Sequence, residues 1–129
     1  MKNKPISPKL HSIIDYGLVA SLFTLPTLFG FSRKVRGLYA AEAAALLVYV
    51  ALTDQPLAVK PLIPFPTHGK IDPFNVANFA LHSVLKPFRR DKRAMLFNTL
   101  FTVAAGVTVA LTNWDGPTQQ HPQGQPPPV

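Results

Sequence analysis

The stretch HSIIDYGLVASLFTLPTLFGF, residues 11–31, decides the fold of this chain. It carries a single formal charge, on Asp15. A helix rises about 1.5 Å per residue, so a helix of this length covers roughly the 30 Å of a bilayer's hydrocarbon core. We therefore predict that residues 11–31 form a membrane-spanning helix with a kink near Pro26.

Three further apolar segments follow, separated by short polar or basic turns. They are residues 37–53, 68–85 and 94–112. The middle one is the most polar, but its polar side chains recur at spacings of three, three and four, which places them on one stripe of a helix. The sequence therefore predicts an all-α protein, an integral membrane bundle of four helices built from two tandem helical hairpins.

The ends of the chain differ from this four-span domain, which we place at residues 11–114. Residues 1–10 form a polar N-terminal segment, and Ser7 followed by Pro8 favours a helix start there. Residues 115–129 are rich in Pro and Gln and have almost nothing to bury, so we expect this tail to be disordered.

Composition excludes several classes of function. Thirteen Lys and Arg against six Asp and Glu give a net charge of +7, but the cations lie beside apolar runs, so we assign them to lipid head groups and predict no nucleic-acid binding. The chain has no Cys, and therefore no disulfide, thiolate metal site or thiol nucleophile. We find no phosphate-binding loop, HExxH motif or nucleophile motif, and we predict that the protein is not an enzyme.

Basic residues concentrate on the two turns that close the hairpins. The positive-inside rule places the more basic side in the cytoplasm, which puts both termini outside. The residues that we assign to lipid head groups and topology are Arg33, Lys34, Arg36, Arg89, Arg90, Lys92 and Arg93.

The two halves of the chain look alike, at about residues 8–54 and 65–113. PKLHSIID at 8–15 matches FPTHGKID at 65–72, and each places His and Asp four residues apart at the start of a span. Each half then gives a span, a basic turn and a second span, ending in ALTD and ALTN. We interpret the halves as an internal repeat whose copies share one membrane orientation.

This arrangement resembles the bacterial SPW-repeat membrane proteins, which end the first span of each repeat with a Ser-Pro-Trp-Leu-Phe-Gly-Phe-like sequence. The matching residues here are LPTLFGF at 25–31, with the Ser and Trp replaced, and the second copy, SVLKPF at 83–88, has diverged further. The resemblance implies a small multi-pass protein of the bacterial cytoplasmic (inner) membrane. It implies no activity, cofactor or catalytic residue.

The two His/Asp pairs of the repeat, His11 with Asp15 and His68 with Asp72, form the first group of candidate site residues. The simpler interpretation is helix capping with a hydrogen bond from His to Asp within each pair. Alternatively, because the two helices start on the same side, all four residues form a 2-His-2-carboxylate metal or proton site. From the sequence we assign no metal ligand and no cofactor.

The second group centres on Glu42, which lies inside the second span among alanines and needs a partner there. We expect a buried intramembrane cluster of polar side chains that holds the helices together, or alternatively a proton-relay, ion or quinone site. A third possibility is that the Glu42 side chain extends to the membrane interface. Its members are Glu42, Asn75, Asn78, His82 and Asn98.

The leading functional hypothesis is a non-enzymatic scaffold or accessory subunit that acts through helix association. Its surroundings would be the lipid bilayer, and its partner a second copy or a larger membrane complex. One alternative is a small proton or ion transporter or channel that uses Glu42, His82, Asp15 and Asp72. The other is a redox-associated protein that binds quinone or haem through its histidines.

Overall fold

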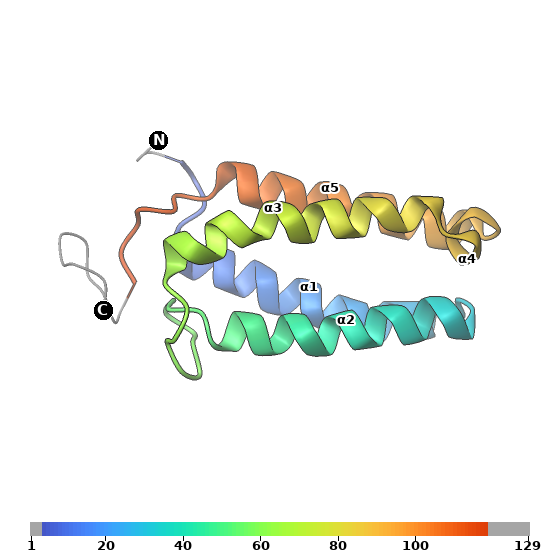
Figure 1. Ribbon diagram of the computed structural model, residues 1–129, viewed down its shortest axis with the longest axis horizontal. Helices are drawn as coiled ribbons and strands as arrows, with labels where there is room; N and C mark the ends of the chain where they lie inside the picture. Colours follow the sequence, from blue (N-terminus) through green and yellow to red (C-terminus); the bar gives the residue numbers. More distant parts are fainter. Residues whose placement is uncertain (1–3, 119–129) are drawn as a thin grey trace.

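Four long helices lie side by side and alternate in direction along the chain (Figure 1). The computed structural model describes residues 4–118. The long helices are α1 (Pro8–Leu28), α2 (Arg33–Ala51), α3 (Phe65–Leu81) and α5 (Lys92–Leu111). A 3₁₀ turn (His82–Val84) and the short helix α4 (Lys86–Arg89) join α3 to α5. The prediction of an all-helical chain is confirmed.

α1 and α2 start at serine caps, which explains why they begin before the predicted spans. Ser7 accepts a hydrogen bond from the backbone N–H of Leu10 (3.1 Å), and Pro8 occupies the first helical position, as predicted. Ser32 caps α2 in the same way, so the basic residues from Arg33, which we placed in a turn, form the first turn of α2. Each of these helices therefore begins three or four residues before its predicted span.

The second basic turn is also more structured than predicted. α3 ends at Leu81, four residues before the predicted end of its span, because the backbone tightens into a 3₁₀ turn and Pro87 follows in the first turn of α4. Phe88 on α4 turns back into the core and is 1% exposed. Asp91 then caps α5 by accepting from the N–H groups of the next turn.

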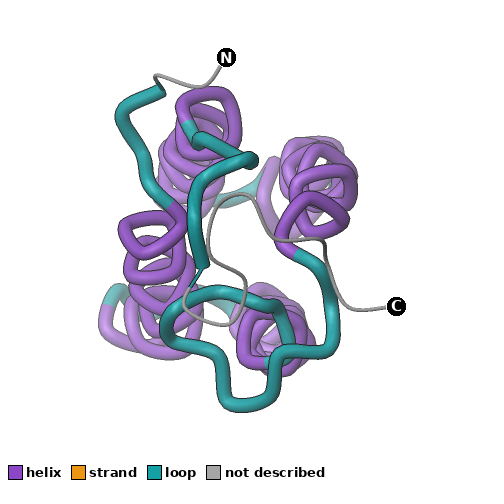
Figure 2. The backbone as a smooth tube through the Cα atoms, turned by 90° about the vertical axis from the view of Figure 1, so that its left-hand side faces the viewer, coloured by secondary structure: helices purple, strands orange, loops and turns teal. Residues whose placement is uncertain are grey.

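The bundle consists of two hairpins. α1 packs mainly on α2 and α3 mainly on α5, and the view along the bundle shows the four helices around a common axis (Figure 2). Large apolar side chains fill the half of the bundle near the basic turns, where Val35 and Tyr39 are completely buried beside Phe79 and Phe88.

The ends of the two predicted repeats pair with each other across the molecule. Ile6, just before α1, forms a parallel bridge with Thr112, just after α5, and Ile63, just before α3, forms one with Thr53 after α2. The start of each repeat therefore binds the end of the other. Both bridges lie at the same end of the bundle. They set the axial positions of α1 relative to α5 and of α3 relative to α2.

Among the described residues, α5 alone is long and apolar enough to cross a membrane by itself, with a mean hydropathy of 1.8 and 22% of the span buried. α3 has only 17 residues, and α2 begins with a basic turn. One such helix does not distinguish a membrane span from the core helix of a soluble protein.

Candidate functional site

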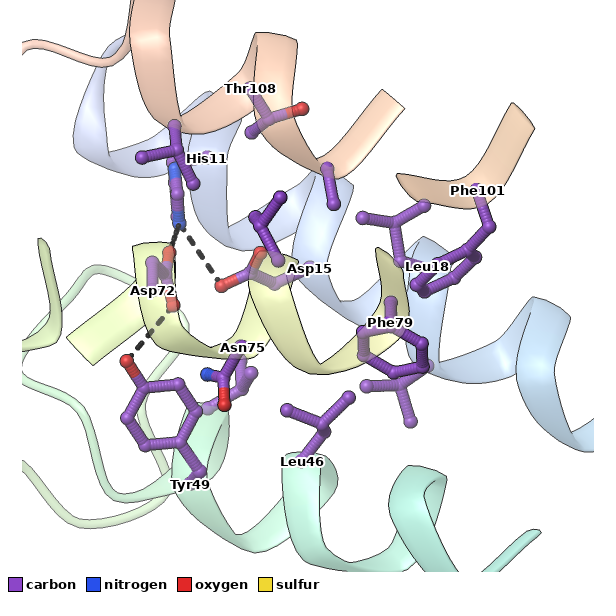
Figure 3. Close-up of a pocket in the computed structure, with 15 residues that line it drawn as sticks. His11, Asp15, Leu18, Leu46, Tyr49, Asp72, Asn75, Phe79, Phe101 and Thr108 are labelled. Carbon is purple, nitrogen blue, oxygen red and sulfur yellow. Dashed lines mark hydrogen bonds and ion pairs between the residues drawn. The ribbon is translucent and has the colours of Figure 1, made fainter. Parts of the chain in front are cut away.

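Two histidines and two aspartates, His11, Asp15, His68 and Asp72, meet inside the bundle at the end where the crossed pairs lie. Nε2 of His11 lies 3.2 Å from Asp15 and 3.4 Å from Asp72, and Nε2 of His68 lies 3.3 Å and 3.2 Å from the same two carboxylates. Figure 3 shows His11 between Asp15 of its own helix and Asp72 of α3. Each histidine therefore contacts the carboxylate of its own repeat and that of the other, which capping within separate pairs does not explain.

A threonine fixes each imidazole ring from behind. Nδ1 of His11 lies 2.8 Å from the hydroxyl of Thr112, and Nδ1 of His68 lies 2.7 Å from the hydroxyl of Thr53. Both hydroxyls donate their proton to the backbone carbonyl four residues earlier in their own helix. They are therefore acceptors toward histidine, so Nδ1 of each ring carries the proton.

The inner ring nitrogens have no such partner. Among residues 4–118, Nε2 of His11 and Nε2 of His68 are buried without a hydrogen bond. Both histidines are 1% exposed. Buried polar atoms are nearly always hydrogen-bonded, so two such nitrogens 3.2 to 3.4 Å from two carboxylates mark a candidate ligand site.

Aromatic rings surround the histidines. Tyr49 stacks on His68 at a centroid distance of 4.2 Å, and its hydroxyl lies 2.9 Å from Asp72. Trp114 packs edge-on against His11 at 4.8 Å and sits so close to Gly69 that a Cβ there would lie 2.6 Å from the indole. These rings form an apolar wall around the site. Electrostatic interactions inside the site are strong because the surroundings have a low dielectric constant.

A cavity of about 50 Å³ lies beside the cluster and is lined by side chains of all four long helices. His11, Asp15 and Asp72 form its polar end, Asn75 lies on its wall, and apolar residues such as Phe79 form the rest (Figure 3). This space is large enough for water or another small ligand next to the carboxylates.

The second predicted cluster is smaller than expected and lies between α2 and the end of α3. Nε2 of His82 lies 2.7 Å and 2.9 Å from the two oxygens of Glu42, and the amide of Asn78 donates to Glu42 at 2.6 Å. Asn78 is exposed rather than buried, so the prediction of a wholly interior cluster is wrong at this residue.

Two members of the predicted cluster lie elsewhere. Asn98 is buried, but it accepts from the hydroxyl of Tyr39 (2.6 Å) and donates to the carbonyl of Phe79 (2.8 Å). Asn75 faces the cavity beside Asp72 instead of Glu42. The position of each residue along its helix follows from its residue number, whereas its partner depends on the rotation of the helix about its axis.

The basic residues assigned to topology gather at the opposite end of the molecule from the His/Asp site. Arg33, Lys34 and Arg90 line a shallow groove there together with Lys86. Arg93 is engaged with the chain itself, because its guanidinium donates to the carbonyl of Phe29. The two hairpin turns thus form one cationic end.

Sequence reasoning missed the residues that support the His/Asp site. Thr53 and Thr112 occupy equivalent positions in the ALTD and ALTN endings of the repeats, so the repeat itself contained the signal. Tyr49 and Trp114 gave no comparable signal, because neither has an equivalent in the other repeat.

The predicted tail falls mostly on residues 119–129, outside the described part of the chain. No family model, curated protein or solved structure matches this sequence, so the family resemblance stays a prediction that depends on the residues at 25–31.

Proposed function

We propose that this is a multi-pass membrane protein, with α1, α2, α3 and α5 all in the bilayer, that acts as a non-enzymatic scaffold or accessory subunit. The observation that carries the proposal is the inverted distribution of side chains. The buried residues include almost as many polar as apolar side chains, while large apolar residues are exposed on every long helix. Water-soluble bundles place these classes the other way round.

The surface of α5 illustrates this inversion. Five large apolar residues recur along one face at spacings of three and four and are between 41% and 61% exposed. They are Leu96, Leu100, Val103, Val107 and Leu111. An apolar stripe along a whole helix needs an apolar environment, and acyl chains supply it on every side of the bundle at once.

The charges support the same arrangement. Between the basic end and the His/Asp site, the only Asp, Glu, Lys or Arg on the long helices is Glu42, and it is bound to His82 and Asn78. The shortest long helix, α3, has 17 residues and extends about 26 Å, close to the hydrocarbon thickness of a bilayer. Charged ends with a neutral middle suit a membrane and have no comparable purpose in water.

Helix association is supported by the outer face of α2. Ala40, Ala41, Ala44 and Ala45 are exposed there and leave a smooth face with no long side chains. In lipid, small residues allow helices to approach closely and pack by van der Waals contact. We therefore propose that this face binds another transmembrane helix, either from a second copy or from a larger complex.

Fractionation of cells tests the membrane proposal. We expect the full chain to sediment with the membranes, to resist extraction at alkaline pH and to dissolve only in detergent. Recovery in the aqueous fraction without detergent would refute it.

The mass of the detergent-solubilised protein tests the association proposal. We expect a dimer or a complex with a stoichiometric partner, and Ala41→Leu or Ala45→Leu should dissociate it. Ala20→Leu, at an exposed position of α1, is the matched control and should leave the assembly intact. A monomer would contradict helix association while leaving membrane insertion untouched.

A small-ion pathway is the second candidate, because titratable side chains lie near both ends of the bundle with a cavity beside one group. In vesicles containing the protein, an imposed potential would then drive proton entry, and Glu42→Gln would reduce it. Haem has less support, since carboxylates lie 3.2 to 3.4 Å from Nε2 of His11 and His68 and occupy the space that a porphyrin between the rings requires.

A further inference from the structure

We propose that His11, Asp15, His68 and Asp72 bind one divalent transition-metal ion, for which Zn²⁺ fits best. The inference goes beyond the scaffold function and does not depend on the membrane. It rests on the distances among the four donor groups, on the ring nitrogens that the threonines leave facing the carboxylates and on the chemistry of the donor set.

The distances are those between neighbouring ligands of a tetrahedral ion. Zn²⁺ binds imidazole nitrogen at about 2.0 to 2.1 Å and carboxylate oxygen at about 2.0 to 2.2 Å, and the ligands of a regular tetrahedron of this size are about 3.3 to 3.5 Å apart. Oδ2 of Asp15 lies 3.2 Å from Nε2 of His11 and 3.3 Å from Nε2 of His68. Asp72 offers a different oxygen to each histidine, Oδ2 to His11 at 3.4 Å and Oδ1 to His68 at 3.2 Å. Donor atoms of His11, Asp15 and His68 also lie within 4.8 Å of one another.

The same protein contains a direct comparison with an ordinary His–carboxylate hydrogen bond. Nε2 of His82 approaches Glu42 to 2.7 and 2.9 Å, the range of a charge-assisted hydrogen bond. In the four-residue site the corresponding distances are about half an ångström longer, and Nε2 of both histidines lacks a hydrogen bond within the described chain. The spacing leaves room for an ion between the groups.

The threonines prepare both rings for metal binding. Thr112 and Thr53 accept from Nδ1 of His11 and His68, so in the neutral ring the lone pair is on Nε2 and points toward the two carboxylates. A divalent cation between the two lone pairs and the two carboxylates would be bound by all four groups at once. Orientation of ligating histidines by a second hydrogen bond is the usual construction around a metal.

The charge of the site favours a divalent ion. Two carboxylates and two neutral imidazoles carry a charge of −2, which one M²⁺ ion cancels, and a buried site of zero net charge avoids a large desolvation cost. Mixed nitrogen and oxygen ligands suit Zn²⁺, whereas Mg²⁺ and Ca²⁺ prefer six or more oxygen ligands. The cavity beside Asp15 and Asp72 gives space for an additional small ligand of the ion.

Metal analysis of the full-length protein, purified in detergent without a polyhistidine tag, tests the proposal. After treatment with a chelator and titration with Zn²⁺ against a chromophoric competitor, we expect one ion per chain, retained in a large excess of Mg²⁺. Asp72→Asn and His68→Gln should each weaken binding by more than about 100-fold, since loss of a supporting residue alone typically costs 10- to 100-fold.

His82→Gln and Glu42→Gln are the matched controls, because they alter the other His–carboxylate pair. Both should retain one ion with the affinity of the parent. Loss of the ion in either control, or full affinity in Asp72→Asn, would overturn the assignment. So would a parent protein that takes up no Zn²⁺ at micromolar concentration, which is the expected result if two protonated histidines simply pair with the two aspartates.

Cobalt substitution gives a readout that does not require a variant to fold. Co²⁺ in place of Zn²⁺ should produce the intense visible absorption of a tetrahedral site with nitrogen and oxygen ligands, and added Zn²⁺ should abolish it. The weak absorption of octahedral Co²⁺, unchanged from buffer, would overturn the proposal.

Discussion

Thr112 shows how a single side chain controls the His/Asp site without facing it. Its hydroxyl donates to the carbonyl of Thr108 and accepts from His11, which places the proton of the ring on Nδ1. Val has nearly the same shape as Thr but no acceptor. We therefore expect Thr112→Val to weaken Zn²⁺ binding by about 10- to 100-fold while the helical circular dichroism stays unchanged.

Thr102→Val is the control for this prediction. Thr102 also lies on α5 and donates to the carbonyl four residues earlier, but no histidine contacts it. Its Zn²⁺ affinity should equal that of the parent protein. Equal affinities in both threonine variants would mean that the Nδ1 contact does not orient His11.

At this scale the sequence predicted which residues matter better than it predicted their partners. The spacing of His11 and Asp15, repeated at His68 and Asp72, pointed to the residues that converge. It could not show that each histidine contacts both carboxylates, because that depends on how α1 and α3 are rotated toward each other. Asn98 demonstrates the same limit, since its partner is Tyr39 instead of the predicted Glu42.

At the scale of the element, α3 depends on a glycine for its contact with the C-terminal segment. A Cβ on Gly69 would lie 2.6 Å from the indole of Trp114, so Gly69→Ala must displace the ring that covers His11. We expect a loss of about 1 to 3 kcal/mol in the free energy of unfolding, as for other overpacked sites. Trp114 is the only Trp, so its fluorescence in detergent reports both the displacement and the unfolding.

Gly17→Ala on α1 is the matched control. Gly17 is also inside a helix, but a Cβ there meets nothing within 4 Å. Because Ala favours a helix by about 1 kcal/mol over Gly, this variant should be as stable as the parent or more stable. If Gly69→Ala behaved in the same way, Trp114 would not be packed against α3.

The number and order of the long helices followed from the apolar runs, but their ends did not. Hydropathy marks where a segment becomes apolar, whereas a helix begins where a side chain satisfies its free N–H groups. Ser32 therefore extends α2 through charged residues that hydropathy assigned to a turn. In the turn of the second hairpin, Pro87 and the buried Phe88 replace the predicted turn by a separate short helix.

At the scale of the whole molecule, the crossed pairing of the repeats explains why the site is at one end. The start of each repeat pairs with the end of the other, and these pairs bring Thr112 beside His11 and Thr53 beside His68. Neither hairpin alone contains a complete set of ligands with their supporting threonines. The site is consequently a property of the assembled bundle, and metal binding should stabilise the bundle as a unit.

If the bundle spans a membrane as proposed, its orientation decides which compartment the His/Asp site is near. The cationic end should face the cytoplasm, which leaves the site and the loop at 52–64 near the outer surface.

The chain has no Cys, so single cysteines at exposed positions report the orientation. In intact bacterial cells a membrane-impermeant maleimide should label Lys60→Cys, and it should label Lys34→Cys only after the membrane is permeabilised. The reverse pattern would place the site on the cytoplasmic side. Labelling of both positions from outside would contradict a bundle that spans the membrane, because Lys34 lies in the first turn of α2 and Lys60 follows the other end of that helix. Figure 1 shows these two ends of α2 at opposite ends of the bundle.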